Sequence, residues 1–164
     1  MRLEQEFLEA SRVFLRDDFM PRLLHCLNQF SDSDLWWRPN ETSNSAGNLV
    51  LHLAGNVRQW IGEALVGIPS HRDRDAEFTA RYPIPKAELI AKLESAVGDV
   101  VSMLEHFDAD RLLQRHHVQL YEVTALQAIY HVVEHFSYHL GQIIYVYKLR
   151  TGVDPKFYEA LSTK

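Results

Sequence analysis

Three histidines spaced four residues apart, His131, His135 and His139, are the side chains of this sequence best placed to do chemistry together. They lie in the apolar segment 125–149, which lacks proline and contains one glycine, so we expect it to form one long helix. Side chains four residues apart lie above one another on a helix, so each neighbouring pair could hold one cation between two imidazoles. His131 and His139 could not form such a pair, because eight residues of helix span about 12 Å.

A helical wheel favours His135 and His139 over His131. Both lie on an apolar arc that must face a core, while His131 falls on its edge. The apolar members of this arc are Ala128, Val132, Phe136, Ile143 and Val146. A buried imidazole needs a partner, and in most proteins that partner is a hydrogen bond rather than a metal. A metal site would therefore need a third ligand from elsewhere.

A second polar pattern runs along the helix predicted at residues 45–66. Six polar side chains share one side of this helix: Ser45, Asn48, His52, Asn56, Gln59 and Glu63. A solvated helix face is the usual reason for such a stripe. The alternative is a wet or metal-bearing cavity inside a helical bundle, where the stripe binds a ligand or orients a histidine. The pattern alone leaves both interpretations open.

Helical periodicity places these two segments among four long helices, at about 3–30, 45–66, 85–107 and 125–151. Pro21 should kink or split the first helix near Met20. We therefore predict an all-α protein, a single domain over 1–164, folded as a four-helix bundle with long connections. A short C-terminal helix is expected near 155–162.

The segments that connect the helices, and the wide apolar face of the last helix, lead to further predictions. The polar link 67–84, which contains SHRDRDAEF, is long enough to be the lid or rim of a site or simply a mobile loop. The crossover 108–123 is expected to include extended structure around HHVQLYEV. The histidine helix is apolar over about 180°, more than one core needs. Its excess face predicts either a homodimer seam or burial by the chain's own loops.

Composition narrows the classes of partner. The 164 residues carry a net charge of −5 without a block of Lys or Arg, which disfavours nucleic acid and anionic membranes. Cys26 is the only cysteine, which excludes an internal disulfide and cysteine-rich zinc sites. We expect Cys26 to be a small core residue. With no signal peptide and no run of 18 apolar residues, a cytoplasmic protein is expected.

Two segments resemble a known family. WWRPNETSNSAGNLVLHLAGNVRQWI around His52 and HVVEHFSYHLGQI around His135 and His139 resemble the DinB/YfiT-like family of metal-binding four-helix bundles. The resemblance implies that a divalent metal is held by one histidine of the second helix and two of the last. In this sequence these are His52, His135 and His139. The family often has a basic residue after the final histidine, where this chain has Leu140.

Three neutral imidazoles suit zinc, nickel or a related first-row ion and leave at least one coordination position open. An ion with an open position can polarise an oxygen, or lower the pKa of a bound water or thiol. We expect four amide side chains to orient the imidazoles or hold a substrate: Asn48, Asn56, Gln59 and Gln142. Glu63 and Glu134 are candidate bases, although Glu134 faces outward.

The resemblance further implies a metal-dependent thiol S-transferase or isomerase, similar to bacillithiol transferases and mycothiol-dependent maleylpyruvate isomerases. A low-molecular-weight thiol would be the cosubstrate and a small electrophile the substrate. Two alternatives stay open, because three histidines and a vacant position suit each of them. One is a metal-dependent hydrolase. The other is a metal-containing or empty bundle that binds a small molecule or a partner without turnover.

Overall fold

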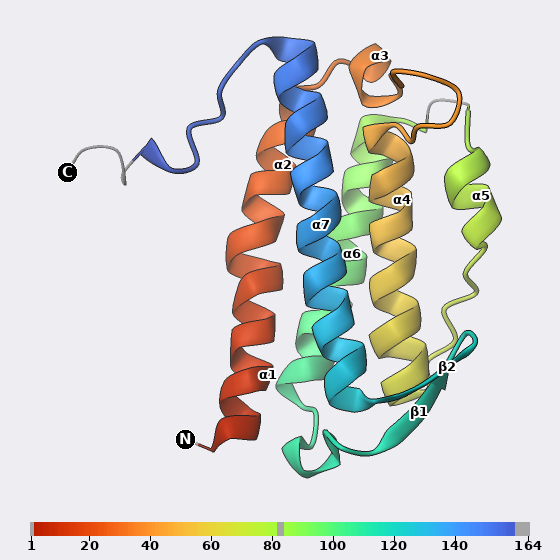
Figure 1. Ribbon diagram of the computed structural model, residues 1–164, viewed down its shortest axis with the longest axis vertical. Coiled ribbons are helices and arrows are strands. Elements are labelled where there is room, and N and C mark those ends of the chain that lie inside the picture. Colours follow the sequence, from red (N-terminus) through yellow and green to blue (C-terminus); the bar gives the residue numbers. More distant parts are fainter. Residues whose placement is uncertain (1, 82–83, 160–164) are drawn as a thin grey trace.

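The computed structural model describes residues 2–81 and 84–159, most of which are helical (Figure 1). The elements, in chain order, are α1 (Leu3–Val13), η1 (Phe14–Phe19), α2 (Met20–Gln29), α3 (Asp32–Leu35), α4 (Ala46–Val57), η2 (Arg58–Val66), α5 (Arg74–Thr79), α6 (Lys86–Glu105), η3 (Ala109–Arg111), β1 (Arg115–Val118), β2 (Tyr121–Thr124) and α7 (Ala125–Thr151). The all-α prediction is confirmed, with one small β-hairpin added.

The first long segment joins α1, η1 and α2 without a break. Its middle part, η1, is a π-helix that ends two residues before Pro21. Proline has no N–H to donate to the preceding turn, and a π-helical stretch is one way for a helix to absorb such a gap in its ladder. The interruption predicted near Met20 is therefore confirmed as a change of helix type.

The helix that carries His52 begins and ends at the predicted signals. Ser45 is its N-cap, and the side chains of Ser45 and Asn48 bond each other's backbone N–H groups in a capping box. The helix continues from α4 through η2 to Gly67, whose φ of +82° is the left-handed conformation that commonly ends helices.

The helix that carries His135 and His139 is similarly defined. Thr124 and Gln127 form its capping box, and Gly152 ends it with a φ of +67°. The hairpin β1–β2 precedes it, with Val118 opposite Tyr121 and Arg115 opposite Thr124. This hairpin is the extended structure predicted in the crossover.

The long helical segments lie side by side, with the hairpin at one end and α5 on the outside of α4 (Figure 1). Helix α4 contacts α5 on its outer side and α6 and α7 on its inner side. The buried apolar side chains form one cluster drawn from all the long segments. His52, on α4, is thereby brought next to α7.

The link 67–84 is not a plain loop, because α5 occupies Arg74–Thr79. The predicted C-terminal helix lies partly outside the described residues; up to Glu159 the chain forms turns. No helix within 2–81 and 84–159 combines the length and hydropathy needed to cross a bilayer.

The chain itself covers much of the excess apolar face of α7. Ile129 and Tyr147 are fully buried and Leu140 is 4% exposed. Burial by the chain's own elements therefore accounts for these three residues. The homodimer stays a prediction, which light scattering at micromolar concentration would test.

Candidate metal centre

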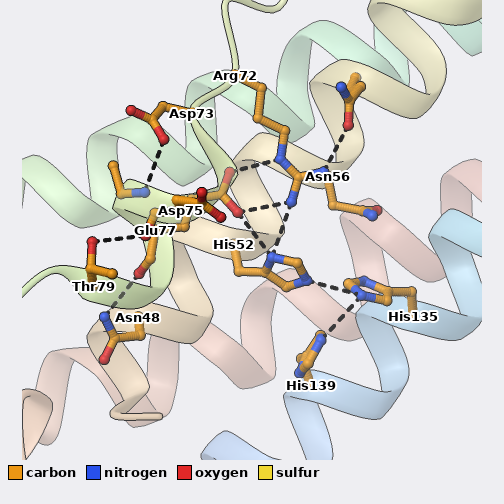
Figure 2. Close-up of polar contacts among 12 residues, drawn as sticks. Asn48, His52, Asn56, Arg72, Asp73, Asp75, Glu77, Thr79, His135 and His139 are labelled. Carbon is orange, nitrogen blue, oxygen red and sulfur yellow. Dashed lines mark hydrogen bonds and ion pairs between the residues drawn. The ribbon is translucent and has the colours of Figure 1, made fainter. Parts of the chain in front are cut away.

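Three imidazoles from two helices meet at one point (Figure 2). Nε2 of His135 lies 3.1 Å from Nε2 of His52 and 3.1 Å from Nε2 of His139. His52 comes from α4, while His135 and His139 lie one turn apart on the facing side of α7. His52 is 5% exposed and His139 is 9% exposed. The site is thus closed over most of its surface.

The outer nitrogens of two rings fix where their protons lie. Nδ1 of His52 is 2.9 Å from Oε2 of Glu77, and Nδ1 of His139 is 2.7 Å from Oε1 of Gln142. Ionised carboxylate and amide oxygens only accept hydrogen bonds, so both imidazoles donate through Nδ1. In its neutral form each of these rings therefore points the lone pair of Nε2 into the cluster.

His135 is left between two bare nitrogen acceptors. A proton on its Nε2 could be donated to His52 or His139 but could not satisfy both. Burial, together with the neighbouring His139 and His52, lowers the pKa of His135 to about 3. The ring is therefore neutral at physiological pH. Three imidazole nitrogens that face one point are, with the rings neutral, the donor set that a divalent first-row ion takes, so these residues fit a metal.

A buried ion pair supports His52 from outside. The side chain of Arg72 is 2% exposed and that of Glu77 is 8% exposed; Arg72 Nε lies 2.7 Å from Glu77 Oε1. Arg72 Nη2 also lies 2.8 Å from Glu77 Oε2 and 3.0 Å from His52 Nδ1. Arg72 Nη2 and His52 Nδ1 are both donors, and they lie close together because both donate to Oε2 of Glu77.

The charge of Glu77 is maintained despite its burial. Burial alone would raise its pKa, but hydrogen bonds from Arg72 and His52 outweigh that effect and hold the pKa below its usual value. An ionised Glu77 keeps the Nδ1 proton on His52. The Nε2 of His52 is therefore kept free to bind a cation.

Helix α5 delivers Glu77 to this position. Asp73 caps the helix by accepting from the N–H of Ala76. Asn48, fully buried on α4, donates from Nδ2 to the backbone oxygens of Glu77 at 2.9 Å and Ala80 at 3.1 Å. These bonds fasten α5 against α4, and its Phe78 packs on the His52 ring with centroids 4.6 Å apart.

The amides expected around the imidazoles have different roles. Gln142 contacts His139 as described above. Asn48 does not contact an imidazole: it binds the backbone of α5. Gln59 accepts from Arg72 at 3.0 Å and from Gln119 at 2.8 Å, so it reaches His52 only through Arg72. Asn56 Nδ2 lies 3.5 Å from His131 Nε2.

The remaining candidates lie away from the cluster. The His131 ring packs against Trp60 in a tilted arrangement, with centroids 4.0 Å apart, one turn from His135. Glu63 is exposed and contacts Ser70, and Glu134 is exposed on the outer face of α7. The polar stripe is therefore buried from Ser45 to Asn56 and reaches solvent at Glu63. Neither glutamate is placed to act as a base at the cluster.

Sequence reasoning missed Arg72 and Glu77, which complete the site. They lie in the polar link 67–84, whose length is compatible with the lid or rim of a site but does not single out these two residues. A cap residue, Asp73, stands directly before the helix that carries Glu77 and was a local signal for it. No local signal could show that this Arg and Glu are buried as a pair.

Comparisons with known proteins agree with this architecture. A family model described as "Protein of unknown function (DUF1572)" matches residues 3–162. Among solved structures, the chain is similar to a DinB-like protein from Bacillus cereus ATCC 10987, with a TM-score of 0.66 and 14% sequence identity. That match covers 88% of this chain and 95% of the other. No curated protein sequence matches the chain.

Proposed function

Because the chain belongs to the DUF1572 family, a DinB-like family, and brings three imidazole nitrogens together, we propose that it binds a divalent metal ion. The ligands are Nε2 of His52, His135 and His139. The observation that carries this proposal is the position of His135 Nε2, 3.1 Å from both other Nε2 atoms. Zinc and nickel are among the first-row ions that a set of three imidazoles suits. We infer that the long segments form a four-helix bundle around this centre.

The ligand set favours a reactive site over a structural one. Structural zinc sites usually have four protein ligands, whereas catalytic sites have three and leave a position for water or substrate. When bound, the ion would supply a Lewis acid that makes a thiol or water more acidic. The residues of the chain hold the imidazoles in place: Glu77 fixes the ring of His52 and Gln142 fixes that of His139.

We further propose that the protein is a metal-dependent thiol S-transferase or isomerase that uses a low-molecular-weight thiol and a small electrophile. The chain's own thiol does not serve, because Cys26 is fully buried and burial raises its pKa to about 11. Such a thiol reacts poorly, since the thiolate is the nucleophile. The reacting sulfur must then come from a second molecule.

A small molecule has room beside the candidate centre. A groove of about 570 Å³ runs between the loop 39–44 and α7. Among its lining residues are Tyr138, whose ring centroid lies 5.0 Å from that of His139, and Gln142, which holds His139. The described lining carries hydroxyl, amide and aromatic groups and no charged side chain. This lining favours an uncharged portion of the substrate.

The test is thiol consumption. Zinc- or nickel-loaded protein is incubated with cysteine and 1-chloro-2,4-dinitrobenzene, in which the sulfur forms a C–S bond, chloride leaves and the thiol proton passes to solvent. We expect consumption above that of chelator-treated protein and of His52→Gln. Equal rates in all three samples would rule out transferase activity with this pair of reagents. Hydrolysis of p-nitrophenyl acetate by the loaded protein, and not by the chelator-treated protein, would instead favour a metal-dependent hydrolase.

A further inference from the structure

His135 differs from the two other candidate ligands in its outer nitrogen. Nδ1 of His52 donates to Glu77 and Nδ1 of His139 donates to Gln142. Nδ1 of His135 is buried and has no hydrogen-bond partner among the described residues. Metal-ligating histidines almost always donate their other ring N–H to an acceptor. Among the described residues, His135 is therefore the one candidate ligand whose outer nitrogen has no acceptor.

A matching acceptor lies in the adjacent layer. Asn56 is one turn after His52 on α4, and His131 is one turn before His135 on α7. Asn56 Nδ2 lies 3.5 Å from His131 Nε2, and the ring centroids of His131 and His135 are 5.1 Å apart. The Asn56 amide thus borders the cluster.

The oxygen of this amide is itself without a partner. Asn56 is 3% exposed, and its Oδ1 is the only oxygen among the buried, unpartnered side-chain atoms of the described residues. Exchanging the oxygen and nitrogen of the amide would not remove the problem, because an unpartnered buried N–H would take its place. Neither Oδ1 nor His135 Nδ1 is open to solvent. With its proton on Nδ1, His135 offers an enclosed donor and Asn56 Oδ1 an enclosed acceptor, and neither has a partner among the described residues.

We propose that Asn56 is a positioning residue for His135, with its Oδ1 accepting the hydrogen bond from His135 Nδ1 when a cation is bound to Nε2. This inference rests on the proposed metal binding. It gives each ligand its own acceptor: Glu77 for His52, Gln142 for His139 and Asn56 for His135. The proton of His135 is then held on Nδ1, and Nε2 is kept for the ion.

The amide can satisfy both of its histidine neighbours at this position. It offers an acceptor to His135 and, on the other side, a donor to Nε2 of His131. The His131 ring is in turn packed against Trp60, with centroids 4.0 Å apart. An aspartate could still accept from His135 but could not donate to His131. A leucine, similar in shape, could do neither.

Zinc affinity of three variants tests the proposal. We expect Asn56→Leu to weaken zinc binding about 10- to 100-fold, the usual cost of losing the acceptor of a ligating histidine. Asn56→Asp keeps an acceptor and should stay within a few-fold of the natural protein. His131→Phe leaves Asn56 Oδ1 in place and should behave like Asn56→Asp. Circular dichroism confirms that each variant is folded.

A second readout separates positioning from general structural damage. In nitrogen-15 labelled, zinc-loaded protein, His135 should show a slowly exchanging Nδ1 proton that is absent in Asn56→Leu. Unchanged zinc affinity in folded Asn56→Leu, or an unchanged Nδ1 proton, would overturn this inference alone. Natural protein that bound no zinc would overturn the proposed metal binding, and this inference with it.

Discussion

Gly55 on α4 leaves room for the carboxylate of Glu77. A Cβ built on Gly55 would lie 2.0 Å from Oε1 of Glu77 and 2.8 Å from Nε of Arg72. Real Cβ atoms essentially never approach other atoms as closely as 2.0 Å. The buried ion pair can therefore rest against α4 only because residue 55 has no side chain.

The first prediction concerns this glycine. Gly55→Ala should displace Glu77 and destabilise the protein by about 1–3 kcal/mol, the usual cost of overpacking, and should weaken zinc binding. Gly62→Ala is the matched control, because its Cβ would lie 3.8 Å from the nearest atoms, those of Met103. This control should be neutral or stabilising by up to about 1 kcal/mol. Urea unfolding and zinc titration measure both effects; equal behaviour of the two variants would contradict the close packing of Glu77.

The second prediction concerns the carboxylate itself. Glu77→Gln removes the charged acceptor of His52 and should weaken zinc binding about 10- to 100-fold. It also leaves Arg72 buried without a counter-ion, so the metal-free variant should be destabilised by about 3–5 kcal/mol. Asp75→Asn, an exposed change on the same helix, is the control and should change neither quantity. If the two variants bound zinc equally well, Glu77 would not be a support of the site.

The third prediction separates the histidines of α7. His135→Ala should lower the metal content of the purified protein, because it removes the nitrogen between the other two. His131→Ala should leave the content near that of the natural protein, because the His131 ring packs against Trp60 outside the cluster. Elemental analysis after dialysis measures the content. Equal losses in the two variants would refute the assignment of His135 as a ligand.

The fourth prediction concerns pH. Burial lowers the pKa of His131 and His139, and that of His135 to about 3. Between a folded pKa and the unfolded value of about 6.5, the unfolded chain binds more protons, so stability rises with pH. The metal-free protein should therefore lose stability on acidification below about pH 6.5, by up to about 1.4 kcal/mol per pH unit for each histidine. Urea unfolding at about pH 7.5, 6.5 and 5.5 measures this loss.

A stability that did not change over that pH interval would show that these rings are not enclosed as described.

Glu77 acts in the same direction at lower pH. Its folded pKa lies below the usual value, so its contribution is present above about pH 4.5 and is lost as the pH falls through the folded pKa. Exposed histidines, by contrast, would not give the loss of stability below about pH 6.5, because their pKa would be similar in the folded and unfolded chain.

Much of the fold could be predicted because its signals are local. Ser45 and Thr124 are N-caps, and Gly67 and Gly152 are C-terminal glycines; each acts within a few residues of itself. Helix α5 was not predicted, because six residues in a polar link give too short a pattern to separate from a solvated loop. Elements held by tertiary contacts rather than by their own periodicity are missed in this way.

The candidate site shows the same difference between residues placed by local spacing and residues placed by tertiary packing. The wheel selected His135 and His139 because both lie on one helix, where spacing fixes their relative position. The place of His52 beside them depends on how α4 packs against α7, and the resemblance supplied that relation before the structure did. Nothing in the sequence near Asn48 shows that it binds the backbone of α5, because the acceptors, Glu77 and Ala80, lie about 30 residues further along the chain. The Arg72 and Glu77 pair was missed for the same reason.

The most direct test of the central claim is a crystal structure of the zinc-loaded protein, with the ion located by anomalous scattering. We expect one zinc ion per chain, bound by Nε2 of His52, His135 and His139 at about 2.0–2.1 Å. Zinc found elsewhere on the chain, or these three imidazoles bonded only to one another in the presence of excess zinc, would contradict the account.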